Sequence, residues 1–212
     1  MNLILLGAPG AGKGTQAEML AAKLQIPTIS TGNMLREAMA NGSELGKQVK
    51  QAMDEGRLVA DELVLGIVAE RTAKPVCKNG FILDGVPRTL SQAEALDQKG
   101  VRIDHVVSIE IDDEVIEGRM TGRRVCSKCG ASYHLVANPP KQEGICDSCG
   151  GALTVRKDDA PETVRKRLAV YHESTEVLKQ YYEKQGKLRL VKGDQPIADA
   201  FKEILRAIGE DA

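Results

Sequence analysis

The chain has 212 residues, enough for one domain with an insertion or for two small domains. A chain of this length can bury a stable core without the help of disulfides or metal ions. Lys and Arg total 29 and Asp and Glu total 30, so the formal net charge is −1, which argues against a general nucleic-acid binder. With no Trp, two Phe and four Tyr, the chain also lacks the aromatic residues of a stacking platform for single-stranded nucleic acid.

The first residues do not match the pattern of a signal peptide. The apolar run after Met1 has no basic residues before it and is too short for a signal peptide, and no run approaches the roughly 18 residues of a membrane span. We therefore expect a cytoplasmic protein without a membrane partner. Disulfides are uncommon in that compartment, so the five cysteines need another role.

The N-terminal half alternates short apolar runs with helical patterns. Residues 3–6 form a continuous apolar run ended by Gly7, which predicts a buried strand, and a glycine-rich loop follows. We expect a helix over 16–24, a strand near 26–29 and two helices over 31–53 that break at 41–43. Asp61 is a candidate cap for a helix to about residue 73.

The second half continues this alternation. Residues 81–83 predict a strand ended by Asp84, and the capping-box spacing from Thr89 to Gln92 predicts a helix to about residue 98. Residues 106–111 and 188–191 predict two more strands. A helix is expected from Pro161 to about residue 185, and a last helix begins near residues 194–196.

This order predicts an α/β fold, with a parallel five-stranded sheet and helices on both of its faces. Residues 126–153 interrupt the pattern, because they hold four cysteines, two adjacent prolines and several glycines without a helical period. We interpret this segment as an inserted lobe.

A phosphate-binding loop is indicated between the first strand and the first helix. The residues are Gly7-Ala8-Pro9-Gly10-Ala11-Gly12-Lys13-Gly14-Thr15, which match the spacing G-x-x-x-x-G-K. Glycines let backbone N–H groups approach phosphate closely, and the lysine reaches the outer phosphates. Gly14 stands where Ser or Thr usually follows the lysine and can ligate Mg²⁺, and Thr15 lies one position later. The loop predicts nucleotide binding but leaves the reaction open.

The inserted lobe carries the spacing of a structural zinc site. Cys126 and Cys129, then Cys146 and Cys149, form two C-x-x-C pairs that are sixteen residues apart. Four thiolates complete a tetrahedral shell and leave no position for catalysis. His134 is a less well spaced alternative ligand. Cys77 remains unpaired and is expected to be a small packed residue.

Two further motifs distinguish among nucleotide-binding proteins. Ser30-Thr31-Gly32-Asn33-Met34-Leu35-Arg36 and Asp84-Gly85-Val86-Pro87-Arg88-Thr89 resemble the acceptor-site signatures of nucleoside monophosphate kinases. Gly122-Arg123-Arg124 opens the inserted lobe, Arg156-Lys157-Asp158-Asp159 closes it, and Arg167 follows on the long helix. In order and spacing, the whole chain resembles the adenylate kinase family in its long-lid, metal-binding bacterial form.

The resemblance implies reversible phosphoryl transfer from Mg·ATP to AMP, giving two ADP, and it assigns residues to roles. ATP-binding positions are Gly10, Ala11, Gly12, Lys13, Gly14, Thr15, Arg119, Arg123, Ser132, Tyr133 and Gln195. AMP-binding positions are Thr31, Arg36, Arg57, Leu58, Val59, Gly85, Val86, Pro87, Arg88, Gln92, Arg156 and Arg167. Catalytic positions are Lys13, Asp84, Arg88, Arg123, Arg156, Arg167, Asp158 and Asp159. The metal ligands are Cys126, Cys129, Cys146 and Cys149.

The resemblance also implies cofactors and a domain organisation. Mg²⁺ would accompany ATP, with Asp84 positioning it through water, and a structural Zn²⁺ would hold the four cysteines. Residues 1–29, 60–121 and 160–212 would form the nucleotide-binding core, 30–59 an AMP-binding lobe and 122–159 a lid. We expect a monomer that uses ATP, AMP and ADP and binds no nucleic acid.

The expected chemistry agrees with the residue types. A phosphate acceptor is already mostly dianionic at pH 7, so transfer needs charge neutralisation rather than a general base. Arginine suits that task because its planar guanidinium group can donate two hydrogen bonds to a pair of phosphate oxygens.

Two departures from the family pattern stand out: Val86 replaces the more frequent Phe, and Arg57 stands where Lys also occurs. Two alternatives remain open here, a zinc-ribbon nucleic-acid-binding module and a UMP/CMP-type kinase.

Overall fold

The computed structural model describes residues 1–211, and its centre is a five-stranded parallel sheet with the strand order β2-β3-β1-β4-β8. These strands are β1 (Asn2–Leu6), β2 (Thr28–Ser30), β3 (Phe81–Asp84), β4 (His105–Glu110) and β8 (Leu188–Lys192). Each pairs in parallel with its neighbour, β1 with both β3 and β4. The predicted fold class is therefore confirmed.

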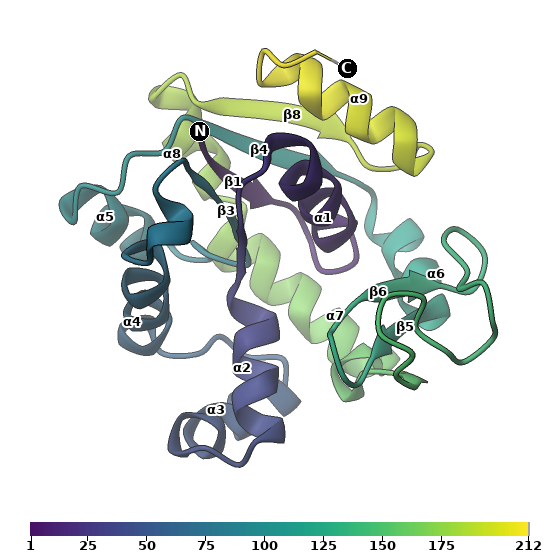
Figure 1. Cartoon of the computed structure of the whole chain (residues 1–212). Coiled ribbons are helices and arrows are strands. Elements are labelled where there is room, and N and C mark those ends of the chain that lie inside the picture. The colour runs from purple at the N-terminus through teal and green to yellow at the C-terminus, as the bar shows by residue number, and fades with distance from the viewer. Residues whose placement is uncertain (212) are drawn as a thin grey trace.

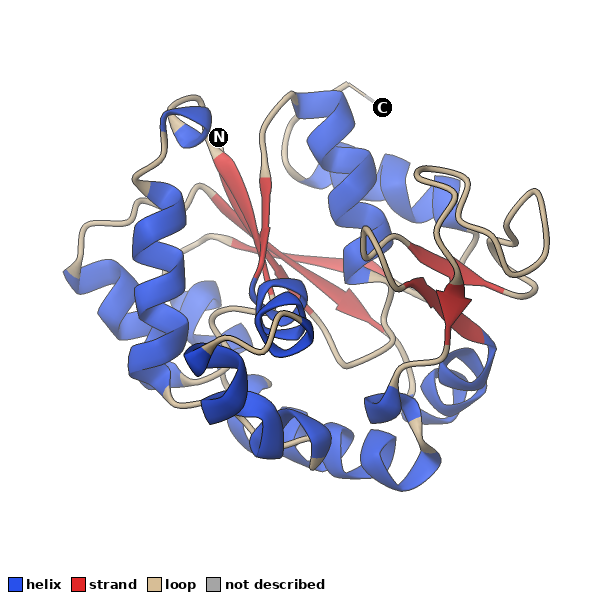
Figure 2. Ribbon diagram, turned by 60° about the horizontal axis from the view of Figure 1, so that its bottom comes forward, coloured by secondary structure: helices blue, strands red, loops and turns tan. Residues whose placement is uncertain are grey.

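Helices cover both faces of this sheet (Figure 2). On β1, Leu3 and Leu5 pack in one apolar cluster with residues of α1 (Lys13–Leu24) and α9 (Ile197–Ala207). Ile4 and Leu6 pack in the opposite cluster with residues of α4 (Asp61–Thr72), α5 (Leu90–Gln98) and α8 (Leu178–Lys184). Because successive side chains point to opposite faces, one short apolar strand supplies both cores.

The strand order places the site. After β1 the chain builds β2 and β3 on one side of it, and then β4 and β8 on the other. The loop at the carboxyl end of β1 therefore lies where the direction of winding reverses, which is where parallel α/β sheets bind ligands. The glycine-rich loop occupies this position, and Asp84 follows at the carboxyl end of the neighbouring strand β3.

A helical lobe projects from β2 on the lower side in Figure 1. It consists of α2 (Thr31–Ala40) and α3 (Glu44–Asp54), which enclose a small cluster around Leu35, Val49 and Ile67. The chain breaks between them at 41–43, as the sequence predicts, and Ser43 caps α3 by accepting the N–H of Gly46 at 3.1 Å.

The cysteine-rich lobe is more regular than the sequence indicates. It contains an antiparallel sheet in the order β6-β5-β7, formed by β5 (Arg123–Cys126), β6 (Ser132–His134) and β7 (Leu153–Thr154). The helix α6 (Asp113–Gly122), which the sequence analysis did not predict, leads into the lobe, and the 3₁₀ turn η2 (Lys157–Asp159) leads out of it. A second short turn, η1 (Pro75–Cys77), precedes β3.

Two sequence predictions are wrong in detail. The helix expected over 161–185 is interrupted: α7 (Pro161–Val170) is followed by a π-helical turn, η3 (Tyr171–Thr175), before α8. Asp61 does not cap α4 but is its first residue, and its carboxylate accepts hydrogen bonds from the α5 residues Ser91 and Gln92 instead. Within residues 1–211, no helix has the length and apolarity needed to cross a membrane.

Candidate active site

The glycine-rich loop wraps around the side chain of Lys13. Lys13 Nζ donates to the carbonyl oxygens of Gly7 at 2.6 Å and Ala8 at 2.8 Å. Gly12, with φ of 100°, directly precedes α1 and adopts a left-handed conformation that other residues rarely take. The N-terminus of α1 therefore opens onto the loop, where its free N–H groups favour an anion.

Burial changes the acid–base behaviour of this lysine. The pKa of Lys13 is lowered to about 8, chiefly by burial; Asp84 opposes this effect, and repulsion from Arg88 adds to it. An anion beside Nζ would raise this pKa again, so a negatively charged ligand would complete the electrostatics of the site.

A large cavity that opens to solvent, with about 1760 Å³ of space including the part outside its mouth, lies between this loop, the carboxyl ends of the sheet and the cysteine-rich lobe. The predicted ATP-binding residues all line it: Gly10, Ala11, Gly12, Lys13, Gly14, Thr15, Arg119, Arg123, Ser132, Tyr133 and Gln195. Arg119 is held there by donating to the carbonyl oxygen of Gly193 at 2.8 Å. Residues far apart in the sequence thus converge on one cavity.

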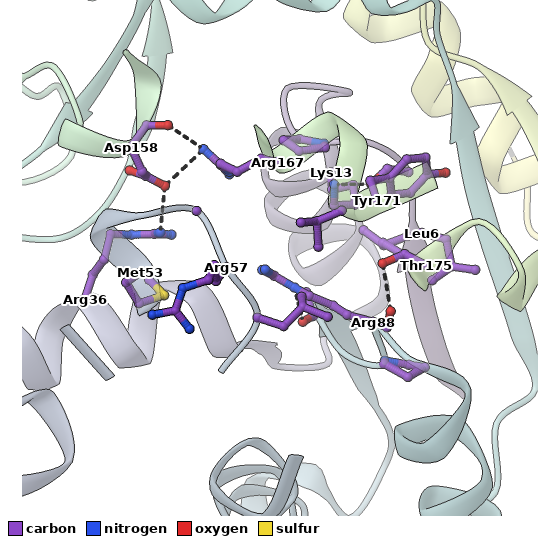
Figure 3. Close-up of a pocket in the computed structure, with 18 residues that line it drawn as sticks. Leu6, Lys13, Arg36, Met53, Arg57, Arg88, Asp158, Arg167, Tyr171 and Thr175 are labelled. Carbon is purple, nitrogen blue, oxygen red and sulfur yellow. Dashed lines mark hydrogen bonds and ion pairs between the residues drawn. The ribbon is translucent and has the colours of Figure 1, made fainter. Parts of the chain in front are cut away.

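A smaller cavity, also open to solvent, has about 740 Å³ of space including the part outside its mouth and lies beside the helical lobe (Figure 3). Seven residues from the predicted AMP-binding set line it: Arg36, Arg57, Leu58, Gly85, Pro87, Arg88 and Arg167. Arg156 lines the larger cavity instead. Met53 and Leu58 contribute apolar groups to the lining of the smaller cavity, and Lys13 and four arginines contribute positive ones. Of these arginines, Arg36 and Arg57 lie beside Met53 (Figure 3).

The two cavities meet at a group of positive side chains. Six residues line both of them: Pro9, Lys13, Arg36, Gly85, Arg88 and Arg167. Around the larger cavity, seven cationic side chains face two carboxylates, those of Glu18 and Asp84. This excess of positive charge suits two polyanionic ligands whose phosphates meet at the junction.

Two consecutive aspartates hold the arginines in place. Asp159 has a side chain that is 0% exposed, and it accepts both Nε, at 2.8 Å, and Nη2 of Arg123. Asp158 lies between Arg167, at 3.0 Å, and Arg36, at 3.9 Å (Figure 3). Burial alone would raise the pKa of Asp158, but the surrounding guanidinium groups, Arg167 first, outweigh burial and lower it.

Arg156 completes this group from the end of the cysteine-rich lobe. Its Nη2 donates to Asn33 Oδ1 at 3.4 Å, while its buried Nε has no hydrogen-bond partner among residues 1–211. Burial, followed by repulsion from Arg36 and Arg123, lowers the pKa of Arg156 to about 9. An unpaired donor beside other cations indicates a position for a bound anion.

Apart from the four cysteines, five sequence-predicted site residues line neither cavity. Asp159 lies behind Arg123, and Val59 packs against the cores. Val86 is 1% exposed and belongs to the same buried apolar cluster as Val64 and Val68.

The other two, Thr31 and Gln92, are buried, and their side chains form hydrogen bonds with the main chain of the loop Gly85–Arg88. Thr31 Oγ1 donates to the carbonyl oxygen of Gly85 at 3.0 Å. The Gln92 amide accepts the N–H of Arg88 and donates to Asp61 Oδ1, both at 2.7 Å. These two side chains therefore hold the loop that carries Arg88, one layer behind the smaller cavity.

Other lining residues were not anticipated. Tyr171 and Thr175, on the π-helical turn, line the smaller cavity, and Thr175 Oγ1 donates to the carbonyl oxygen of Arg88 at 2.8 Å (Figure 3). Asn33 and His134 line the larger cavity. Asn33 lies in the Ser30–Arg36 motif, so the sequence could have identified it as a site residue. No local sequence pattern predicts the π-helical turn.

The four cysteines of the inserted lobe form a compact cluster. Their Sγ atoms all lie within 4.8 Å of one another, with Cys126 to Cys149 at 3.4 Å and Cys129 to Cys146 at 3.6 Å. Tetrahedral Zn²⁺ with Zn–S bonds of about 2.3 Å separates its sulfur atoms by about 3.8 Å. Gly151 allows this approach, because a Cβ there would lie 2.8 Å from Cys126 Sγ. The donor set and the spacing therefore fit zinc.

Hydrogen bonds favour the thiolate form of two of these four cysteines. The hydroxyl of Tyr133 is the main cause that lowers the pKa of Cys146 to about 6, and the N–H groups of Cys129 and Lys128 outweigh burial and help to lower the pKa of Cys126. A backbone N–H lowers the pKa of Cys129, but burial and the neighbouring thiols that bond to it outweigh this effect and raise that pKa. The His134 ring is oriented by accepting the N–H groups of Val136 and Ala137 at Nδ1, and it is not part of the cysteine cluster.

A phosphate loop, a second cavity that meets the first at a cationic junction, and a lobe over the larger cavity define a P-loop phosphotransferase acting on two anionic substrates. Comparison with known proteins narrows this class. The family model described as adenylate kinase matches residues 5–187. The chain is 56% identical to the adenylate kinase of Caldicellulosiruptor bescii over 213 residues, covering 99% of each chain.

Two further relatives agree. The chain is 53% identical to the adenylate kinase of Agathobacter rectalis, covering 99% of this chain and 100% of the relative, and 54% identical to that of Archaeoglobus fulgidus, covering 96% of each. The chain belongs to the adenylate kinase family, a group of ATP:AMP phosphotransferases. This assignment replaces both alternatives left open by the sequence.

Proposed function

We propose that the chain transfers a phosphoryl group from Mg·ATP in the larger cavity to AMP in the smaller one, with ADP as the product of both half-sites. The single observation that supports this arrangement is the junction at which Lys13, Arg36, Arg88 and Arg167 line both cavities. A donor phosphate and an acceptor phosphate that meet there would be held in line by the same cations.

In this proposal the protein acts by position and charge. The loop N–H groups and Lys13 hold the outer phosphates of ATP, and Arg88 and Arg36 hold the phosphate of AMP. Arg123, Arg156 and Arg167 face the group in transit, where negative charge spreads over its oxygens. Asp159 orients Arg123 from behind and does not touch substrate, whereas Asp158 lines the smaller cavity and holds Arg167 there.

Residues 122–159 are proposed as a lid over the larger cavity and 30–59 as the AMP-binding lobe. Water competes with AMP as an acceptor, so a lobe that carries Arg123 at one end and Arg156 at the other would exclude water when it closes. Residues of one chain line both cavities, and we therefore propose a monomer that needs no nucleic acid or second subunit.

The residues present fit both expected metals. The Asp84 carboxylate lines the larger cavity, with Oδ2 accepting from Ser30 Oγ at 3.0 Å, and oxygen ligands of this kind are those that Mg²⁺ prefers. Bound Mg²⁺ would neutralise phosphate charge. Zn²⁺ in the four-cysteine site would be structural, because four thiolates leave it no open position.

We expect a strict preference for AMP among acceptors. The base of the acceptor would lie near Met53 and Leu58, and Asp158 is the one carboxylate lining the smaller cavity, where it is engaged by Arg167 and Arg36. A guanine N–H edge would find no free acidic partner and would be left unpaired, and a pocket without a partner for an added polar group discriminates against it by about 10²-fold. A coupled assay of ADP formation with AMP, GMP, CMP and UMP measures the preference.

Comparable kcat/KM values for AMP and another nucleotide would contradict this acceptor assignment. No ADP formation from any of the four would contradict the proposed reaction as a whole. Replacing ATP with another triphosphate at fixed AMP serves as the control for the donor side.

The pKa of Lys13 predicts a fall in ATP recognition above neutral pH. Because burial lowers that pKa to about 8 in the free chain, Lys13 is charged at pH 7 and mostly neutral at pH 9. We expect kcat/KM for ATP to decline above pH 8, approaching about tenfold per pH unit, while kcat holds to a higher pH because bound phosphates stabilise the ammonium group.

The matched control is Lys13→Arg, because a guanidinium stays charged throughout this range. Equilibrium binding of ATP to this variant, whatever its strength, should be nearly independent of pH between 7 and 9. If binding to the parent chain were equally flat over this range, the lowered lysine pKa would not control ATP recognition.

A further inference from the structure

Tyr133 lies at the boundary between the cysteine cluster and the larger cavity. It sits at the centre of β6, between Ser132 and His134, and is 8% exposed. Its side chain packs in an apolar cluster with Cys126 and Cys146, and the residue also lines the larger cavity. Tyr133 is thus the residue that belongs both to the cluster around the proposed zinc and to the wall of the proposed donor cavity.

The direction of its hydrogen bonds follows from their partners. The Tyr133 oxygen accepts the N–H of Asp147 at 2.8 Å, and the same hydroxyl lies 3.5 Å from Cys146 Sγ. A thiolate that binds a metal has no hydrogen to donate, so the tyrosine must be the donor to sulfur. A hydrogen bond to a ligand atom fixes that ligand's orientation and tunes the metal bond.

The comparison between the two C-x-x-C loops shows that this contact is specific. Both loops close in the same way, with the N–H of Gly130 donating to Cys126 O at 3.1 Å and that of Gly150 to Cys146 O at 2.9 Å. Backbone N–H groups approach Cys126 Sγ at 3.4 and 3.5 Å. Among the described residues, a side-chain hydroxyl reaches the first sulfur of only the second loop, that of Cys146. The C-x-x-C loop geometry therefore does not by itself require the contact from Tyr133.

We propose that Tyr133 is a positioning residue that ties the metal site to the donor-nucleotide cavity, with its hydroxyl supporting Cys146 as a metal ligand and its ring forming part of the cavity wall. The proposal rests on the zinc site and the donor cavity of the proposed function. A nucleotide that packs against the ring restricts it and keeps the hydroxyl on Cys146, so bound ATP and bound zinc stabilise one another.

The experiment measures zinc release from the full-length, zinc-loaded chain into excess chelator, with and without ATP. Tyr133→Phe keeps the ring and removes the hydroxyl, and we expect zinc affinity to fall about tenfold or more, the range found when a partner of a metal ligand is lost. Tyr181→Phe is the matched control, because Tyr181 donates a comparable hydrogen bond to Asp97 Oδ2 at 2.5 Å outside the lobe. This control should release zinc as the parent does.

A spectroscopic readout separates ligand tuning from loosened packing. In the Co²⁺-substituted protein, loss of a hydrogen bond to sulfur should shift the sulfur-to-cobalt charge-transfer band in Tyr133→Phe and leave it unchanged in Tyr181→Phe. Tyr133→Leu, which also removes the ring, should release zinc at least as fast. If only Tyr133→Leu released zinc faster, the ring and not the hydroxyl would matter, and the proposal would be overturned.

ATP provides the test of the coupling. Saturating ATP should slow zinc release from the parent several-fold and should slow release from Tyr133→Phe by less than half that factor. Equal protection of both proteins would overturn the coupling. If the parent chain held no zinc, both the zinc site and this inference would be overturned. If the parent held zinc and Tyr133→Phe behaved like the parent in every readout, this inference alone would be overturned.

Discussion

Alanine at Arg88 or at Arg123 should lower kcat about 10³-fold while changing the affinity for ATP and AMP by far less, because arginines that meet developing charge on a transferred phosphoryl group act mainly in the transition state. Arg88 lies at the junction of the two cavities, and Arg123 lines the larger one. Equilibrium binding and initial rates, measured at saturating concentrations of both nucleotides, separate the two effects.

The two variants differ in their expected structural cost. The Arg88 guanidinium donates to the carbonyl oxygen of Gly85 at 2.8 Å, so its removal leaves no buried charge unpaired. Arg123 is the bidentate partner of the buried Asp159, and its loss leaves that carboxylate with Arg167 at 3.4 Å. We therefore expect Arg123→Ala to lower Tm as well. Removing one partner of a buried ion pair lowers the free energy of unfolding by about 3 kcal/mol or more.

Arg102→Ala is the matched control for charge. Its side chain is 86% exposed and contacts Asp104 at the surface, so both kcat and Tm should stay close to those of the parent. If Arg88→Ala kept its kcat and lost only affinity, Arg88 would be a ground-state binding residue, and the proposed role at the transferred group would be wrong.

Local signals explain why the core of the fold could be predicted. The run at Leu3–Leu6 is apolar on both faces because both faces are covered, and the glycine-rich loop after it carries its own motif. The break at Asn41–Ser43 was recognisable because Gly42 supplies a positive φ and Ser43 supplies a cap. These features depend on a few neighbouring residues and on little else.

Features that depend on tertiary contacts could not be predicted. The π-helical turn brings Thr175 to the main chain of Arg88, yet the sequence around it continues a helical pattern. The strands of the inserted lobe have four, three and two residues, too few to show a period. Gln92 stands three residues after Thr89, as in a capping box, but its amide accepts the N–H of Arg88 and donates to Asp61. Asp61 comes within reach only because α4 packs against α5.

Removing zinc should lower the melting temperature markedly while leaving substantial activity well below the new transition. The cysteine-rich lobe has a buried cluster of only Cys126, Tyr133 and Cys146, whereas the sheet core has two large clusters of its own. A lobe with so little apolar content depends on its metal to fold. If zinc contributes about 3–4 kcal/mol to the cooperative unit, its loss lowers Tm by about 10 °C in a chain of this length.

Metal analysis, thermal unfolding and a rate assay test this expectation on the chelated parent and on Cys126→Ser. Cys77→Ser is the matched control, because that buried thiol donates to the carbonyl oxygen of Arg71 at 3.3 Å and lies outside the lobe; it should retain about one zinc per chain. Full zinc content in a Cys146→Ser, Cys149→Ser double variant would contradict the ligand assignment. Since the phosphate loop, Arg88 and Arg167 lie outside the cysteine-rich lobe, inactive but folded protein at low temperature would instead show that the metal does more than hold the lobe together.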